Sequence, residues 1–188
     1  MKKLVVLCLA VGMLTTLANA QEKPIRIGLK FGIPNIIGLN GEYVTPALGE
    51  RLAPTLDFSY FSVSAGEAKA SFSYLELGAN CYFKSGGKGP YGHLSYGRIG
   101  FSGKYTDPVL GSGKGSLGIN LLNIKLGAKW GNGFYFRPEL GYALLLGNNK
   151  VKVKYDDPTT GQTVTQEKSV PGFLGGGVVF NLGFGVAF

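Results

Sequence analysis

The chain has 188 residues and a formal net charge of +8, and glycine occupies 31 of its positions. Twelve Phe, ten Tyr and one Trp in a 45% hydrophobic composition exclude a disordered chain, and the glycines lack the period of three that indicates collagen. Beyond residue 20, no apolar run approaches the roughly 20 residues that a membrane-spanning helix needs. One β-rich domain is therefore expected, and the open question is which solvent its surface faces.

The first 20 residues predict a secretory signal peptide. Two lysines and an apolar stretch over 4–14 precede a small-x-small cleavage site, Ala-Asn-Ala, which ends at Ala20. Cleavage between Ala20 and Gln21 leaves residues 21–188 as the mature domain and lowers the net charge from +8 to +6. Cys81 is then the single mature cysteine, so no intramolecular disulfide is expected.

Alternation of apolar and polar residues dominates the mature chain, with the period of two that indicates a β-strand with one apolar face. The first segment, for example, puts Ile27 and Leu29 on one face and Arg26 and Lys30 on the other. Eight segments of this kind follow one another, near residues 25–33, 37–43, 52–60, 75–83, 91–97, 122–130, 134–146 and 178–188. The count rises to ten if the short second segment or the last long connection is read differently.

Eight amphipathic strands fit either a soluble sandwich or a membrane barrel, and the lengths of the connections favour the barrel. Short turns at 85–90 and 131–133 alternate along the chain with long polar connections at 102–114 and 148–172. Outer-membrane barrels show this alternation between periplasmic turns and external loops.

Aromatic residues and prolines point the same way. The apolar faces carry aromatic residues near the expected strand ends, as in interfacial girdles. One set is Tyr43, Phe83, Trp130, Phe134, Phe136 and Phe188, and the other is Phe31, Phe58, Tyr60 and Tyr142. Proline cannot donate to a strand ladder, and Pro24, Pro54, Pro90 and Pro138 all lie near the start of an ascending strand, at one rim. The sequence thus predicts an all-β fold, a single antiparallel transmembrane up-and-down β-barrel of about eight strands.

The last strand carries the most specific motif, GVVFNLGFGVAF, which alternates up to Phe188, and FRPELGY over 136–142 is a second motif. With these motifs the chain resembles the small eight-stranded outer-membrane β-barrel proteins of Gram-negative bacteria, OmpA- or OmpX-like, over 21–188. The resemblance implies export through the periplasm to the cell outer membrane, with both termini in the periplasm. It also implies periplasmic chaperones and the barrel-assembly machinery as partners, with Phe184, Val186 and Phe188 as the assembly signal.

The inward faces of the predicted strands carry five bases and four acids. They are Arg26, Lys30, Glu42, Asp57, Glu76, Lys125, Lys129, Arg137 and Glu139. An eight-stranded barrel is just wide enough for side chains to fill it, and unpaired charges inside it are unfavourable. We therefore expect an ion-pair network that closes the lumen and a structural or surface-interaction role. A narrow porin-like channel for small solutes is the alternative.

The connection 148–172 predicts a hairpin that extends beyond the membrane. The alternation changes phase at Asn148-Asn149, which indicates a bulge, and a turn signal follows at 156–161. The edge of this hairpin could pair with a strand of a surface ligand. Its lysines could instead contact the anionic phosphates of lipopolysaccharide, and both interpretations stay open.

A second alternative is an enzyme. His93 and Ser95 form an H-x-S pair similar to the catalytic pair of lipid A deacylases, and Asp107 is the next acid downstream. That family continues with Asn after the Ser and carries the motif outside the barrel, whereas Tyr96 follows here and the predicted register points His93 inward. One histidine and one mature cysteine make a zinc site unexpected, and no other cofactor motif or nucleic-acid module is present. The positive charge instead favours contact with anionic lipid.

Overall fold

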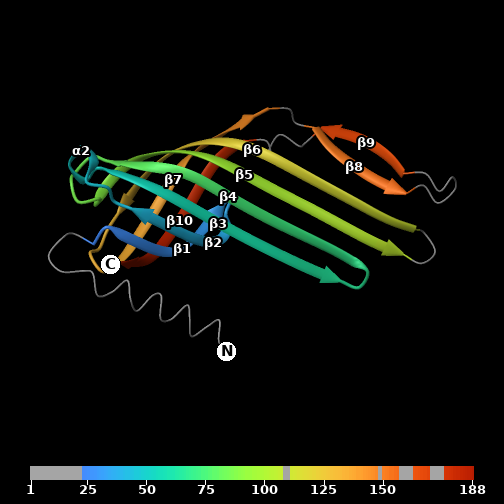
Figure 1. Ribbon diagram of the computed structural model, residues 1–188, viewed down its shortest axis with the longest axis horizontal. Helices are drawn as coiled ribbons and strands as arrows, with labels where there is room; N and C mark the ends of the chain where they lie inside the picture. Colours follow the sequence, from blue (N-terminus) through green and yellow to red (C-terminus); the bar gives the residue numbers. More distant parts are fainter. Residues whose placement is uncertain (1–22, 108–110, 148–149, 157–162, 170–175) are drawn as a thin grey trace.

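The computed structural model describes residues 23–107, 111–147, 150–156, 163–169 and 176–188. Eight antiparallel strands close into a barrel (Figure 1). They are β1 (Ile25–Ile33), β2 (Ile36–Tyr43), β3 (Leu52–Ala65), β4 (Ala68–Tyr82), β5 (Gly89–Asp107), β6 (Gly111–Lys129), β7 (Phe134–Leu146) and β10 (Gly177–Ala187). Each pairs with two neighbours, and β1 and β10 close the ring, so no barrel strand is left as an edge. The predicted fold class is confirmed, and the count is eight. The predicted signal peptide lies outside the described residues.

The first and last strands form the closing seam. Leu29 is opposite Phe184, Ile27 is opposite Val186, and Ile25 and Phe188 exchange backbone hydrogen bonds of 3.4 and 2.8 Å. Alternation places Phe184 and Val186, two of the residues of the expected assembly signal, on the outer surface. The C-terminal motif is therefore the strand that completes the barrel.

The two ends of the barrel differ (Figure 1). At one end, the short helical turn α2 (Ala47–Glu50) and the turns at 83–88 and 130–133 lie beside the start of β1 and the C-terminus. Gly87 donates a backbone hydrogen bond of 3.1 Å to Glu50, which ties two of these turns together. At the other end, β3 to β6 extend far beyond β1 and β2.

The prediction of a loop over 102–114 is wrong for the residues that the structure describes, because β5 extends to Asp107 and β6 begins at Gly111. Their register runs without a break from Gly89 opposite Lys129 to Asp107 opposite Gly111. The segment is rich in Gly, Ser and Lys, so the hydrophobic alternation stops there. The ladder itself is made by backbone groups and does not require that alternation.

The predicted hairpin in 148–172 is present as β8 (Lys150–Asp156) and β9 (Thr163–Ser169). β8 pairs with the extension of β6, where Tyr155 is opposite Gly113, and among the described strands β9 pairs with β8 alone. This hairpin lies outside the closed ring, which explains why ten strands are paired but eight form the barrel. The predicted bulge at 148–149 lies outside the described residues.

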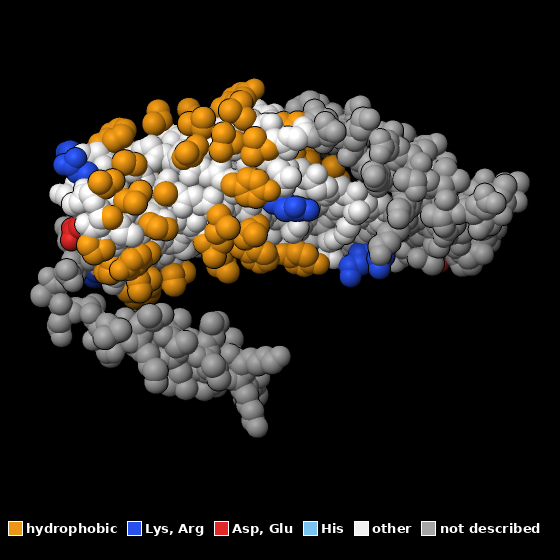
Figure 2. Space-filling model, turned by 45° about the horizontal axis from the view of Figure 1, so that its top comes forward, with side chains coloured by type: hydrophobic (Ala, Val, Ile, Leu, Met, Phe, Trp, Pro, Cys, Tyr) orange, Lys and Arg blue, Asp and Glu red, His pale blue; other side chains and the backbone are white. Residues whose placement is uncertain are grey.

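Apolar side chains cover the outside of the barrel and polar side chains fill much of its inside, the reverse of a soluble protein. Leu29, Leu77, Leu126 and Leu140 are between 45% and 67% exposed, and Cys81 is also exposed. Figure 2 shows hydrophobic side chains spread over one face of the barrel, with few charged ones among them. All ten aromatic residues expected on the apolar faces are at least partly exposed. Within the described ranges, no helix is long and apolar enough to cross a membrane.

Candidate functional site

The lumen holds all nine charged residues that the alternation predicted to point inward, and each is at most 4% exposed. They come from six of the eight barrel strands, β1, β2, β3, β4, β6 and β7. Because charges buried in this way are unfavourable unless they are paired, the arrangement of their partners decides what the lumen can do.

Glu42 of β2 is the centre of one group of ion pairs, near the short-turn end. Its Oε1 accepts from Arg26 Nη1 at 3.0 Å and lies 3.5 Å from Lys129 Nζ, and its Oε2 accepts from Arg137 Nη1 at 2.8 Å. The Tyr82 hydroxyl donates to Oε1 at 2.6 Å. One carboxylate thus pairs with three cations from three different strands.

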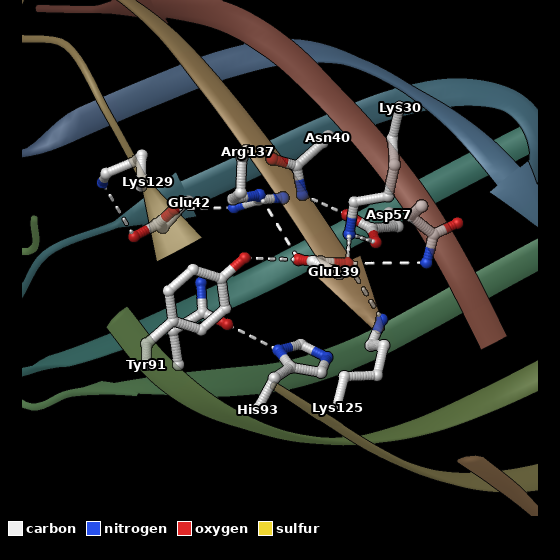
Figure 3. Close-up of polar contacts among 12 residues, drawn as sticks. Lys30, Asn40, Glu42, Asp57, Tyr91, His93, Lys125, Lys129, Arg137 and Glu139 are labelled. Carbon is white, nitrogen blue, oxygen red and sulfur yellow. Dashed lines mark hydrogen bonds and ion pairs between the residues drawn. The ribbon is translucent and has the colours of Figure 1, made fainter. Parts of the chain in front are cut away.

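A second group lies deeper in the lumen (Figure 3). Lys30 pairs with Asp57 and, at 3.1 Å, with Glu139. Lys125 Nζ lies 2.5 Å from Glu76 and 3.5 Å from Glu139. Each lysine therefore bridges two carboxylates, and Glu139 is shared between the two lysines.

Arg137 joins the two groups into one network. Its Nη1 contacts Glu42, and its Nε lies 3.3 Å from Glu139 Oε1, which also accepts from the Tyr91 hydroxyl at 2.7 Å. The pair of Lys129 on β6 and Glu42 on β2 crosses the whole lumen, because four steps separate these strands in either direction around the ring. Side chains from opposite walls therefore meet and fill the cross-section.

Aromatic rings close the lumen at the short-turn end. Tyr82 and Tyr91 pack with ring centroids 5.0 Å apart, beside the buried Val44 and Ala53. Lys129 Nζ lies 4.8 Å from the centre of the Tyr82 ring, a cation–π contact. The charged network is thereby separated from solvent at this end.

Above the network, towards the long hairpins, the lumen becomes apolar. A cluster of buried residues lines the wall there: Phe72, Tyr74, Ile99, Ile119, Leu121, Ala143 and Val179. The alternation continues in phase through these strands, so period two could have located the inward Ile99 and Leu121. The prediction of the lumen from charge left them out. The sequence pattern puts Tyr82 and Tyr91 on the inward faces, but it did not predict that their hydroxyls contact Glu42 and Glu139.

Glycines on the inward face make room for bulky neighbours, most strictly at the closing seam. A Cβ at Gly28 on β1 would overlap the backbone carbonyl of Phe184 on β10 and lie 2.7 Å from the Tyr135 hydroxyl. The space across this seam is therefore reserved for the tyrosine ring and for close approach of the two strands.

Replacement of Gly28 by alanine is expected to lower the free energy of unfolding by about 1–3 kcal/mol, because the added methyl group must push β1 and β10 apart. Gly92→Ala is the matched control, since a Cβ there meets nothing within 4 Å. Urea unfolding of the refolded barrel measures both. Equal midpoints for the two variants would contradict the close packing at the seam.

The residues expected for a hydrolase are not assembled into a catalytic triad. His93 and Ser95 point into the lumen, where His93 Nε2 and Ser95 Oγ both bond to Glu76 Oε1, at 2.7 and 2.6 Å, rather than to each other. Asp107 ends β5, roughly 45 Å along the strand from His93 at about 3.3 Å per residue. The pair is thus part of the network, and the acid is far from it.

The second nitrogen of His93 contacts Asn80. Nδ1 lies 2.6 Å from the Asn80 amide oxygen, while the Asn80 amide nitrogen has no partner among the described residues. With the amide placed in this way both ring nitrogens face oxygen acceptors, as in a protonated imidazole, whereas exchange of the amide oxygen and nitrogen would fit a neutral ring that donates from Nε2 to Glu76. No three His, Cys, Asp or Glu side chains within the described ranges are grouped to hold a metal ion.

Comparisons with known proteins show the fold. No protein-family model matches the chain, and no curated protein sequence matches it significantly. A major outer membrane protein from Thermus thermophilus has a similar structure, with a TM-score of 0.57 and 15% identity over 87% of this chain and 97% of that one. CarO of Acinetobacter baumannii aligns with a TM-score of 0.44 and 13% identity over 90% of this chain and 100% of CarO. The likeness to the Thermus protein extends over nearly its whole chain and supports the closed antiparallel β-barrel fold.

Proposed function

We propose that this protein is a small integral outer-membrane β-barrel with a structural or surface-interaction role and a lumen closed by side chains. The apolar exterior supports the location, because large exposed side chains such as Leu77 and Leu140 encircle the barrel where lipid would solvate them. The proposal includes export through the periplasm after cleavage behind Ala20.

The observation that carries the proposed role is the ion-pair network across the lumen. Lys129 and Glu42 meet from opposite walls, Arg137 links them to Glu139, and Tyr82 and Tyr91 pack at the short-turn end. A permeating ion would have to separate buried, mutually paired charges, which is unfavourable. This geometry favours a closed barrel over a porin-like channel.

Single-channel recording in planar bilayers tests this role. The purified wild-type barrel is expected to give no stable openings, because its lumen is filled by paired side chains. Glu76→Ala removes the partner of Lys125, Ser95 and His93 and is expected to give rare, unstable openings at most. Stable wild-type openings whose conductance changes in Glu76→Ala would instead show that ions pass through the network.

The hydrolase alternative has less support. In the hydrolase pair the serine hydroxyl donates to the histidine ring, but Ser95 donates to Glu76 instead, and the lumen separates the pair from lipid on the outer surface. The proposed role is therefore structural or interactive rather than enzymatic.

The proposed partners follow from the location. They are outer-membrane lipid and lipopolysaccharide, and the periplasmic chaperones and barrel-assembly machinery that would recognise Phe184, Val186 and Phe188. The connection 148–172 is the proposed contact for a surface ligand, since β9 has a free edge among the described strands.

Deletion of residues 150–168 is expected to reduce surface adhesion while the barrel still folds, because β8 and β9 lie outside the closed ring. Adhesion of cells carrying the wild type or the deletion provides the comparison, with surface amount as the control. Unchanged adhesion would leave lipopolysaccharide as the contact of this hairpin.

A further inference from the structure

The mouth of the barrel contains an apolar cavity of about 480 Å³, above the charged network. Its wall includes Phe72, Ile99, Phe101, Leu121, Ala143 and Val179, and no described residue that lines it has a polar side chain. The size is within the range of about 300–1,000 Å³ of small-molecule sites, which are mostly apolar. The network below it does not explain why this part of the lumen should be apolar.

The floor of the cavity is polar and closed. Tyr74, Asn123 and Asn181 each follow a cavity residue by two positions on the inward face of β4, β6 and β10, and all three are at most 1% exposed. Asn123 Nδ2 donates to the Tyr74 hydroxyl at 3.1 Å, and Tyr74 donates in turn to Glu76. The cavity is therefore a blind pocket rather than the entrance of a pore.

On one side of the mouth the strands are short, and the rim that they form is apolar. β1 ends at Ile33, β2 begins at Ile36 and β10 begins at Gly177, whereas β5 and β6 continue to Asp107 and Gly111. Ile33 and Ile36 line the cavity and are also 65% and 54% exposed, and Val178 beside them is 66% exposed. An apolar surface therefore continues from the outside of the barrel, over this rim, into the cavity.

We propose that this cavity binds the hydrocarbon chain of a free single-chain amphiphile, such as a long-chain fatty acid, with the polar head at the mouth. The absence of polar side chains from the described lining leaves burial of apolar surface as the driving force, which a hydrocarbon chain supplies. The apolar rim between Ile33 and Val178 lets such a chain enter from the outer surface without crossing a polar barrier. The blind floor keeps the bound chain in the mouth.

Photo-crosslinking of the full mature barrel in lipid nanodiscs tests the proposal. The probe is palmitic acid with a diazirine near the end of its chain, titrated and then competed with unlabelled palmitic acid. Saturable crosslinks are expected at Phe72, Phe101 or Leu121, mapped by mass spectrometry of peptides. Absence of saturable labelling, or labelling confined to outer residues such as Leu77, would overturn the proposal.

Two variants on adjacent positions of β7 make the test specific. Ala143→Trp fills the cavity and is expected to reduce the saturable labelling at least tenfold, whereas Leu144→Trp places the same ring on the outer face and leaves it unchanged. Equal labelling of the two variants would refute the site. If Ala143→Trp does not fold, the position and saturation of the wild-type crosslinks still decide.

Two other occupants give distinct results. If a diazirine-labelled phospholipid crosslinks Phe101 and Leu121 as efficiently as the fatty acid does, the occupant is a membrane lipid and the proposal of a free amphiphile is refuted. The sequence also places Phe173 and Leu174 just before β10, outside the described residues. Labelling that occurs only after both are changed to serine would identify the chain itself as the occupant and refute the proposal.

Discussion

Replacement of Glu42 by alanine is expected to lower the free energy of unfolding by about 3–5 kcal/mol, the largest effect of any single lumen substitution considered. The carboxylate pairs with Arg26, Lys129 and Arg137, and its side chain is fully buried. Its removal leaves three cations facing one another across the lumen, without the anion that compensates their lost hydration. Guanidinium unfolding followed by the fluorescence of Trp130 measures the loss.

Two further variants are controls: one removes an exposed carboxylate, and the other removes the charge of Glu42 but keeps its shape. Glu67→Ala removes a carboxylate from the exposed turn between β3 and β4 and should change stability by no more than about 0.5 kcal/mol. Glu42→Gln keeps the shape and an acceptor for the Tyr82 hydroxyl, so it should fall between the wild type and Glu42→Ala. A loss below about 1 kcal/mol for Glu42→Ala would contradict the central role of this carboxylate.

Replacement of Leu140 by arginine is expected to destabilise the barrel in a bilayer by about 2–4 kcal/mol. Leu140 is 59% exposed near the middle of the β7 outer face, where the proposed location puts it in hydrocarbon. A guanidinium there loses its hydration and gains no partner. Reversible folding into lipid vesicles, titrated with guanidinium chloride, measures the difference from the wild type.

The depth of the position provides the control. Ser64→Arg changes an exposed residue on the outward side of β3 near the end of the long β3–β4 hairpin, and it should cost no more than about 1 kcal/mol. A soluble barrel would tolerate arginine equally at both positions, because both face water. Equal stabilities of the two variants would therefore contradict the proposed membrane location.

The sequence predicted the barrel part of the fold well, because each strand there has an apolar outer face and a largely polar inner face. From Ile25 to Ile33, for example, apolar outward residues alternate with inward ones, so the period of two is directly visible in the order of the residues. At 102–114 both faces of the ladder are rich in small and polar residues, and the period disappears. The backbone pairing of β5 with β6 persists there, which the sequence pattern could not indicate.

The inward direction of the nine lumen charges could likewise be predicted, but not their partners. Arg26 and Glu42 are neighbours in the strand register, whereas Lys129 and Glu42 are 87 positions apart and meet only because the sheet closes. His93 and Ser95 instead reach Glu76 across the direct pairing of β4 with β5, and the length of β5 leaves Asp107 at its far end. Local spacing cannot specify contacts across a lumen, since these depend on strand order and stagger.

The sequence by itself therefore determined the amphipathic part of the eight barrel strands, their two faces and the nine charged residues that the interior must hold. Only the tertiary structure decided that the charges join into one cross-lumen network through Arg137 and that the mouth above it is an apolar, blind cavity. The physical reason is that alternation is a property of each strand, visible in one dimension. The side chains that fill the lumen, and the short side of the rim beside Ile33, are set only when eight strands of unequal length close around the same space.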